Sequence, residues 1–286
     1  MKKANAAIAY NTNTGSSGSG TSLTYAHTVP VDNPILFVAV RNNVPARTVT
    51  GVTYAGDAMT QAAFETISGT GDRNAYLYYM EAPTTGNNNV VVSISSSDTI
   101  YSSALSYTGV AQSSAIDDIQ VDRGGAAQVF KVTATSTVSG AWGVAYFEES
   151  PQTITEDSNT TQRAQLGGVL NGSKIGDTGA SIDPVGGYTL GYTAPANSWN
   201  WAGLMAVFKP AGGATDSCTY GGSGDWTIDY SDNCNISSSV YVNGDCYLNY
   251  DGAGSFAISN GSTISCGDIY GGAGFNADIC NTCVLN

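Results

Sequence analysis

No cysteine occurs before Cys218, and no lysine or arginine follows Lys209. Charged residues make up only 12% of the 286 residues, which is about half of the usual share. The formal net charge is −13, whereas phosphate groups are bound through clustered lysine and arginine side chains. The composition therefore argues against nucleic acid and against an anionic membrane as partners.

Long apolar runs are also missing. The longest, such as ILFVAV at residues 35–40, have the length of a strand, whereas a membrane-spanning helix needs about 20 apolar residues. We therefore expect no membrane insertion. The start of the chain, MKKANAAIAY, contains only a short apolar stretch that Asn5 interrupts, so it does not predict a cleaved signal peptide.

Histidine is nearly absent, since His27 is the only one. This excludes metal sites with several histidines and argues against a Ser-His-Asp triad. His27 lies in the strand-like stretch LTYAHTV, and we interpret it as a hydrogen-bonded strand residue.

Glycine, serine, threonine, asparagine and tyrosine take the place of the missing charges. Residues 21–209 consist almost throughout of short β-branched or aromatic segments between turn residues, which predicts strands. Ile35–Val40 is apolar on both faces, as in a central strand. About eleven strands without a helical period predict an all-β protein whose main domain is a jelly-roll β-sandwich. The expected strands are 23–29, 35–41, 48–54, 58–64, 75–81, 89–95, 101–109, 128–134, 142–148, 188–194 and 199–209.

Five stretches of this domain carry a resemblance to a known module: SLTYAHTV, VTGVTYAGDAMT, AYLYYMEAPTTGNNNVVVSIS, ALSYTGVAQSSAID and WAGLMAVFKPA. Over residues 21–210 the pattern resembles a jelly-roll module of phage virion surface proteins and of extracellular proteins of uncultivated bacteria. The resemblance implies a jelly-roll β-sandwich and a surface location. It implies no catalytic residues.

A second, smaller module is expected after a Gly-rich linker at residues 210–217. Residues 218–286 contain short strand-like segments and a faint repeat, in which Asn243-Gly244 recurs as Asn260-Gly261. Repeats of this kind predict the stacked rungs of a small β-solenoid. All charged residues after Lys209 are aspartates, so a module of this size needs additional support to fold.

Cysteines are the expected support. An even number of them in a small Gly-rich module predicts a disulfide framework, although the pairing stays open. Cys280 and Cys283 also have the spacing of zinc ligands, but no second pair has it. Persisting disulfides would place the protein outside a reducing cytosol. The six residues are Cys218, Cys234, Cys246, Cys266, Cys280 and Cys283.

The first 20 residues, which include GSSGSG at 15–20, are expected to form a polar N-terminal arm. Ordering each residue of such an arm costs roughly 1–2 kcal/mol of backbone entropy, so an ordered arm needs a partner. We expect residues 1–20 to add as a strand to a sheet edge of another copy, or of a capsid or tail protein.

Three acidic motifs have catalytic counterparts in other proteins. DTGA at residues 177–180 spells the aspartic-protease motif, but it occurs once and no apolar strand precedes it, so we interpret it as a loop. The pairs Glu148-Glu149 and Asp117-Asp118 are adjacent in sequence, whereas glycosidase carboxylates face each other across a cleft. We interpret both pairs as solvated turns and expect no enzyme.

Two binding sites remain as candidates. Asp225, Asp229 and Asp232 form an oxygen-rich cluster near the start of the second module, which is the chemistry that calcium favours. Aromatic side chains of the main domain could form a platform for surface glycans, although such residues pack more often in a sandwich core. These residues are Tyr76, Tyr78, Tyr188, Tyr192, Trp199 and Trp201.

Together these features favour a non-enzymatic structural protein on the surface of a particle, with a phage virion component as the first hypothesis. Such a component would be a capsid decoration, a head fibre or a tail appendage. A secreted carbohydrate-binding or adhesion module is the alternative, and a subunit of an extracellular filament is a further one. Each hypothesis places the protein on a virion surface or in the extracellular space.

Overall fold

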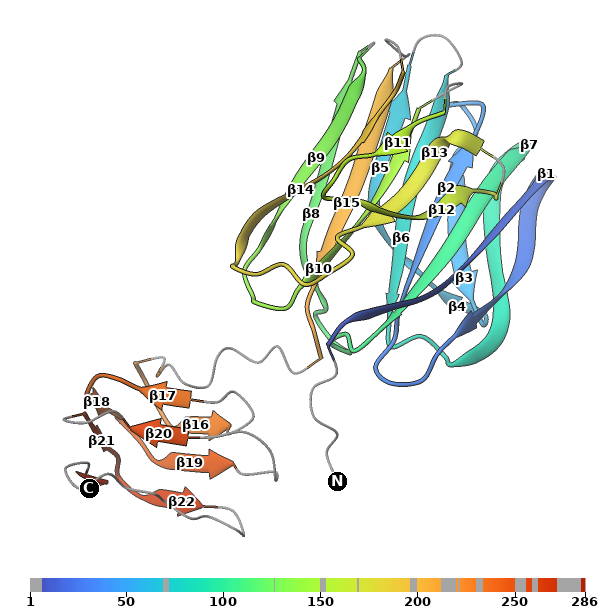
Figure 1. Cartoon of the computed structure of the whole chain (residues 1–286). Helices are drawn as coiled ribbons and strands as arrows, with labels where there is room; N and C mark the ends of the chain where they lie inside the picture. Colours follow the sequence, from blue (N-terminus) through green and yellow to red (C-terminus); the bar gives the residue numbers. More distant parts are fainter. Residues whose placement is uncertain are drawn as a thin grey trace. The chain divides into compact units, whose positions relative to one another are not determined.

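In the computed structural model, the described part of the chain contains strands and no helix, which confirms the all-β fold. The chain divides into two compact units (Figure 1): Asn5–Gly213, and a second unit formed mainly by Ala214–Asn286. Among the described residues no helix is long and apolar enough to cross a membrane. The described residues are 7–68, 72–125, 127–149, 153–168, 170–195, 200–211, 220, 222–229, 234–249, 256–258, 262–271 and 284–285.

The first unit contains a seven-stranded antiparallel sheet in the order β4-β3-β7-β2-β6-β5, with β1 paired to β7. The two longest strands, β1 and β7, pair along most of their length, but their register shifts between Gly20 and Ser22. The partner there jumps from Asp98 to Ser93, and both ribbons bend (Figure 1). The strands are β1 (Ala9–Val29), β2 (Ile35–Asn42), β3 (Val49–Tyr54), β4 (Asp57–Ala58), β5 (Thr60–Ile67), β6 (Arg73–Glu81) and β7 (Gly86–Thr108).

The same unit contains two further antiparallel sheets. One has five strands in the order β12-β13-β10-β15-β8, and the other has three in the order β11-β14-β9. Their strands are β8 (Ile116–Gly124), β9 (Val129–Ser136), β10 (Trp142–Glu148), β11 (Thr155–Glu156), β12 (Thr161–Leu166), β13 (Leu170–Asp177), β14 (Gly186–Thr193) and β15 (Trp201–Phe208).

Strands that are apolar on both faces decide how these sheets are layered. In β2, Phe37 packs in one hydrophobic core together with Leu204 of β15, whereas its neighbour Leu36 packs in a second core together with Val52 of β3. The central strand predicted at Ile35–Val40 is confirmed, because all six residues are fully buried.

The strand β15 repeats this arrangement on the other side of the first core. Leu204 faces that core, while Met205 packs in a third core against Phe130 of β9. Two cores therefore lie between neighbouring sheets, and the second core is enclosed by strands of the seven-stranded sheet itself, where the sequence predicted a single sandwich. The jelly-roll connectivity within this sandwich stays a prediction.

The prediction that the N-terminal residues form a separate arm is wrong for the described part of that segment. Residues 9–20 belong to β1 and pair with residues 98–108 of β7 in the same chain. Glycine at position 15 also lets β1 lie close to the residues that follow β12, since a Cβ atom on Gly15 would lie 2.6 Å from the backbone nitrogen of Gly168. This part of the arm is a strand of its own sheet and is not a free segment.

The second unit is a β-solenoid, as predicted, because its strands pair in parallel with strands one rung away. The first rung is β16 (Trp226–Asp229), β17 (Cys234–Ile236) and β18 (Val240–Tyr241). The second is β19 (Cys246–Asn249), β20 (Phe256–Ile258) and β21 (Thr263–Ser265), and the third contains β22 (Ile269–Gly271) and β23 (Val284–Leu285). Its small core includes Trp226, Ile228, Leu248 and Ile264.

The repeat that sets the rungs is a Gly-Asp pair before β16, β19 and β22, and not the Asn-Gly pair that the sequence suggested. The backbone nitrogen of Asp245 donates to Oδ1 of Asp225, and that of Asp268 donates to Oδ1 of Asp245, each at 3.0 Å. A Cβ atom on Gly244 would lie 2.6 Å from the backbone of Gly224. Glycine is therefore needed where successive rungs touch, and aspartate satisfies the next backbone amide.

A disulfide joins the second rung to the turn after it. Cys246 and Cys266, which are 20 residues apart, are bonded, and Cys234 is disulfide-bonded as well. None of the cysteines in the described part of the chain is free. Cys218, Cys280 and Cys283, with the zinc alternative for the last two, lie outside the described residues.

Candidate functional site

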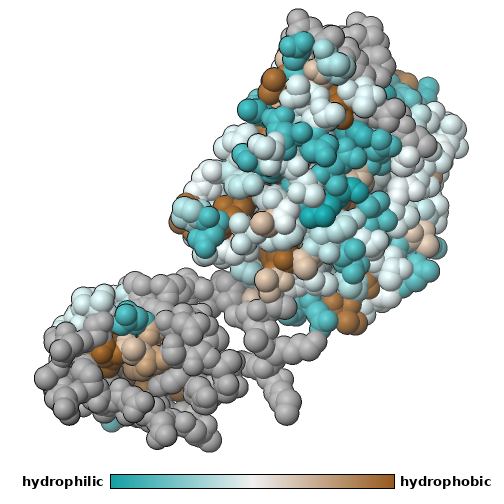
Figure 2. Space-filling model, in the orientation of Figure 1, coloured by the Kyte–Doolittle hydropathy of each residue, from teal (hydrophilic) through white to brown (hydrophobic). Residues whose placement is uncertain are grey.

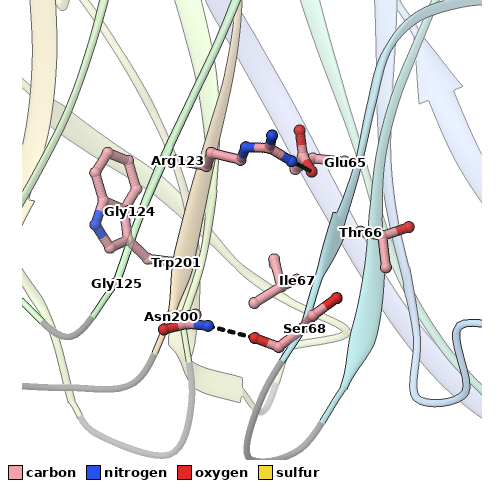
Figure 3. Close-up of a pocket in the computed structure, with 9 residues that line it drawn as sticks. All are labelled: Glu65, Thr66, Ile67, Ser68, Arg123, Gly124, Gly125, Asn200 and Trp201. Atoms are coloured by element: carbon pink, nitrogen blue, oxygen red, sulfur yellow. Dashed lines mark hydrogen bonds and ion pairs between the residues drawn. The ribbon is translucent and has the colours of Figure 1, made fainter.

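The β5–β8 pocket lies where the ends of β5 and β8 meet the start of β15 (Figure 3). β5 and β8 are the edge strands of two different sheets and do not pair with each other through their backbones over the described residues. The cavity has a volume of about 340 Å³. It is lined by Glu65, Thr66, Ile67, Ser68, Arg123, Gly124, Gly125, Asn200 and Trp201.

An ion pair bridges one end of this pocket. Nη1 of Arg123 lies 2.7 Å from Oε1 of Glu65, and the Arg123 side chain is 70% exposed. In Figure 3 the two side chains point toward each other, while the indole of Trp201 lies beside Gly124. The pair places a donor group and an acceptor group side by side at the mouth of the cavity.

Asn200 connects the pocket to the interior of the unit. Its side-chain amide donates to the backbone carbonyl of Ser68. The backbone carbonyl of Asn200 accepts from Nη2 of Arg73 at 3.1 Å. Arg73 is fully buried and pairs through Nε with Glu148 at 2.7 Å. The position of Asn200 is therefore held by a buried charge cluster.

That cluster corrects the interpretation of Glu148-Glu149 as a solvated turn, because both residues are buried. Glu148 also accepts from the Tyr146 hydroxyl at 2.5 Å and lies 3.2 Å from Nη1 of Arg41. Burial, reinforced by the neighbouring carboxylate, raises the pKa of Tyr146 well above its usual value, so the hydroxyl stays protonated and donates. The arrangement balances a buried charge and belongs to the scaffold.

Asp117 and Asp118 lie in β8 and not in a turn. Oδ2 of Asp117 accepts from the backbone nitrogen of Thr137 at 2.7 Å, and Oδ2 of Asp118 accepts from that of Thr135 at 2.8 Å. The two carboxylates thus tie β8 to the end of β9.

Asp177, in the protease-like motif, is a buried residue at the end of β13 and not part of a loop. Its Oδ2 accepts from Nε of Arg163 at 2.7 Å and from the Tyr107 hydroxyl at 3.0 Å. Its Oδ1 accepts from the backbone nitrogen of Gly179 at 2.8 Å. Burial, together with the Asp177 charge, raises the pKa of Tyr107 well above its usual value. The carboxylate is enclosed by its own donors.

His27 is a buried, hydrogen-bonded strand residue, as predicted. Its Nδ1 lies 3.0 Å from the Thr14 hydroxyl and its Nε2 lies 3.2 Å from the Ser106 hydroxyl. It therefore connects the two halves of the bent β1–β7 ribbon. Burial lowers its pKa from 6.5 to about 4.

The low pKa of His27 predicts an acid-sensitive contribution to stability. The unfolded chain binds a proton at His27 below pH 6.5 and the folded chain only near pH 4, so stability is present above pH 6.5 and is lost as the pH falls toward 4. The difference corresponds to about 3 kcal/mol. We expect His27→Gln to lose less stability than the parent chain between pH 7 and pH 4.5 in urea unfolding. Equal losses in the two proteins would contradict this account.

Most residues of the predicted aromatic platform do not form an exposed surface. Tyr76 and Tyr78 lie in the second core, and Tyr192 and Trp201 lie in the third. Tyr188 is half-buried against the third core. Trp199 lies outside the described residues. Over its described residues the platform is therefore corrected to side chains that lie in a core or pack against one.

The predicted calcium site is only partly described. Asp225 is exposed, and its Oδ1 accepts the backbone nitrogen of Asp245. Asp232 and the side chain of Asp229 lie outside the described residues. No group of three or more His, Cys, Asp or Glu residues that could hold a metal ion is found within the part that is described. Calcium binding stays a hypothesis.

No protein-family model and no curated protein matches the chain. The class of the protein is therefore defined by its fold and site. It is an all-β protein that combines a layered β-sandwich, which carries a small polar pocket, with a disulfide-bonded β-solenoid.

Proposed function

We propose that this chain is a non-enzymatic structural protein exposed on the surface of a particle, and specifically a phage virion component. One observation carries the proposal. The groups best suited to acid-base chemistry, Asp177, Glu148 and His27, are all buried and hydrogen-bonded within the sandwich. Their chemistry is used to hold strands together, which is what a rigid display scaffold requires.

The disulfides and the surface support an external location. Disulfides persist outside the reducing cytosol, and Cys246–Cys266 staples a unit that has only a small core. The face of the sandwich seen in Figure 2 is largely hydrophilic with scattered apolar residues. A surface of this kind suits a protein that is permanently in contact with solvent.

The structure changes the docking mode that the sequence suggested. Residues 9–20 lie in β1 of their own sheet, so docking on a capsid or tail protein would not use them as a free arm. The filament alternative loses its basis as well, because it needed the same residues to insert into the next copy. The carbohydrate-binding or adhesion alternative is supported by the β5–β8 pocket.

Fractionation of the producing culture tests this proposal. We expect the full chain to sediment with particles in a density gradient, and to be labelled by a membrane-impermeant amine reagent on intact particles. The major capsid protein of the same particles is the internal control for gradient position. Recovery of the chain only in particle-free medium would favour the adhesion alternative, and recovery in the cytosol in reduced form would refute both.

A further inference from the structure

We propose that the β5–β8 pocket binds a neutral saccharide. The pocket is the meeting point of three strand ends from two sheets, and its walls come from residues 65–68, 123–125 and 200–201. The proposal does not depend on whether the protein is part of a virion.

The size of the gap favours a compact ligand over an added peptide strand. Cα atoms of β5 and β8 approach within 8 Å of each other. A strand inserted between them would need two ladder spacings, about 9.6 Å. The cavity of about 340 Å³ lies at the small end of the range for small-molecule sites. One or two sugar rings suit this space better than an extended chain does.

The charge of the pocket favours a neutral ligand. Oε1 of Glu65 and Nη1 of Arg123 lie 2.7 Å apart and the two charges offset each other, so the described lining of the pocket carries no excess charge of either sign. The chain as a whole carries a formal charge of −13, which repels polyanions. Sulfated and sialylated glycans are therefore disfavoured relative to uncharged ones.

The polar groups of the pocket match vicinal hydroxyls. A guanidinium has five N–H donors and a carboxylate has two acceptor oxygens, and the ion pair joins only Nη1 to Oε1 among the described residues. Each sugar hydroxyl both donates and accepts. Two neighbouring hydroxyls can thus bond Arg123 and Glu65 together, which neither a simple cation nor a simple anion can do.

The pocket is also held in place before a ligand arrives. Asn200 is bonded to Ser68 and to the buried Arg73, and Arg73 is fixed by Glu148. Oδ1 of Asn200 would lie 3.8 Å from a Cβ atom on Gly125, so an amide acceptor borders the open space beside that glycine. A fixed polar wall lowers the entropic cost of binding.

Saturation-transfer NMR on the full oxidised chain tests the proposal. The probes are methyl glycosides of glucose, galactose, mannose and N-acetylglucosamine, with sialic acid and glucuronic acid as anionic counterparts. We expect at least one neutral glycoside to bind with a dissociation constant on the order of 1 mM, and the anionic probes to bind at least tenfold more weakly.

Two variants place the binding in the pocket. Gly125→Val adds a side chain where the nearest atom is 3.8 Å from the new Cβ, so it fills the cavity and should abolish binding. Arg123→Ala removes a charged donor and should weaken binding about tenfold or more. The matched controls are Gly51→Val, where nothing lies within 4 Å of the Cβ, and Lys131→Ala, which removes an exposed cation elsewhere; both should bind as the parent does.

Four results would overturn the proposal: no binding of any neutral probe, stronger binding of the anionic probes, binding that survives Arg123→Ala, or binding that Lys131→Ala abolishes. The first three contradict the ligand or its contacts, and the fourth moves the site elsewhere. If Gly125→Val does not fold, Arg123→Ala decides alone, because its exposed side chain is not needed for the core.

Discussion

Replacing Arg73 by methionine should lower the free energy of unfolding of the sandwich unit by about 3–5 kcal/mol. Arg73 and Glu148 are both fully buried and 2.7 Å apart. Removing the arginine leaves a buried carboxylate whose remaining partners among the described residues are Arg41 at 3.2 Å and the Tyr146 hydroxyl. The loss is large because a buried charge that has been stripped of a partner keeps its full desolvation cost.

The chain offers a matched control for this experiment. Arg123 and Glu65 form a pair of the same type at the same 2.7 Å distance, but with an arginine that is 70% exposed. Arg123→Met should therefore cost less than about 1 kcal/mol. Urea unfolding of the full chain, with hydrogen exchange of β6 and β10 to assign the transition, compares the two variants. Equal losses would mean that burial does not decide the value of these pairs.

Removing the Cys246–Cys266 disulfide should unfold the solenoid unit and leave the sandwich intact. The bridge closes a loop of 20 residues, and a loop of similar length contributes about 3 kcal/mol by restricting the unfolded chain. The solenoid core is small, so little other stabilisation is available. Alanine at both positions avoids burying an unpaired hydroxyl.

Hydrogen exchange on the Cys246→Ala/Cys266→Ala chain measures this effect for each unit separately. Amides of β16, β19 and β22 should lose protection, while those of β2 and β10 keep it. Reduction of the parent chain should give the same pattern. Retained protection in β19 of the double variant would show that the Gly-Asp ladder and the core hold the rungs without the bridge.

The strands with strong apolar patterns were predictable from the sequence. Ile35–Val40 and Trp201–Phe208 are apolar at every or nearly every position, and a strand buried on both faces is the simplest structure that uses them. Strands that have polar or glycine-rich sequences were missed. β8 contains Asp117, Asp118 and Asp122, and β13 contains Gly172 and Gly176, which are residues that local propensity assigns to turns.

The solenoid was predictable as a type but not in its register. Short strands, glycines and an even number of cysteines indicated stacked, bridged rungs. The Gly-Asp pairs at 224–225, 244–245 and 267–268 were visible in the sequence. The first two aspartates act by accepting a hydrogen bond from the backbone nitrogen of the aspartate one rung further on, and this contact exists only in the folded solenoid. The unequal spacing of 20 and 23 residues also hides the repeat from a search for a fixed period.

The sequence by itself determined the all-β class, the two modules and the use of disulfides, because composition and local pattern carry these properties. Only the tertiary structure decided what the polar residues do. Glu148 accepts a hydrogen bond from Arg73, which lies 75 positions earlier in the sequence. Asp177 accepts one from Tyr107, which lies 70 positions earlier. Residues 9–20, polar enough to suggest a free arm, pair with residues 98–108. Partners this distant are set by strand order, which local sequence does not encode.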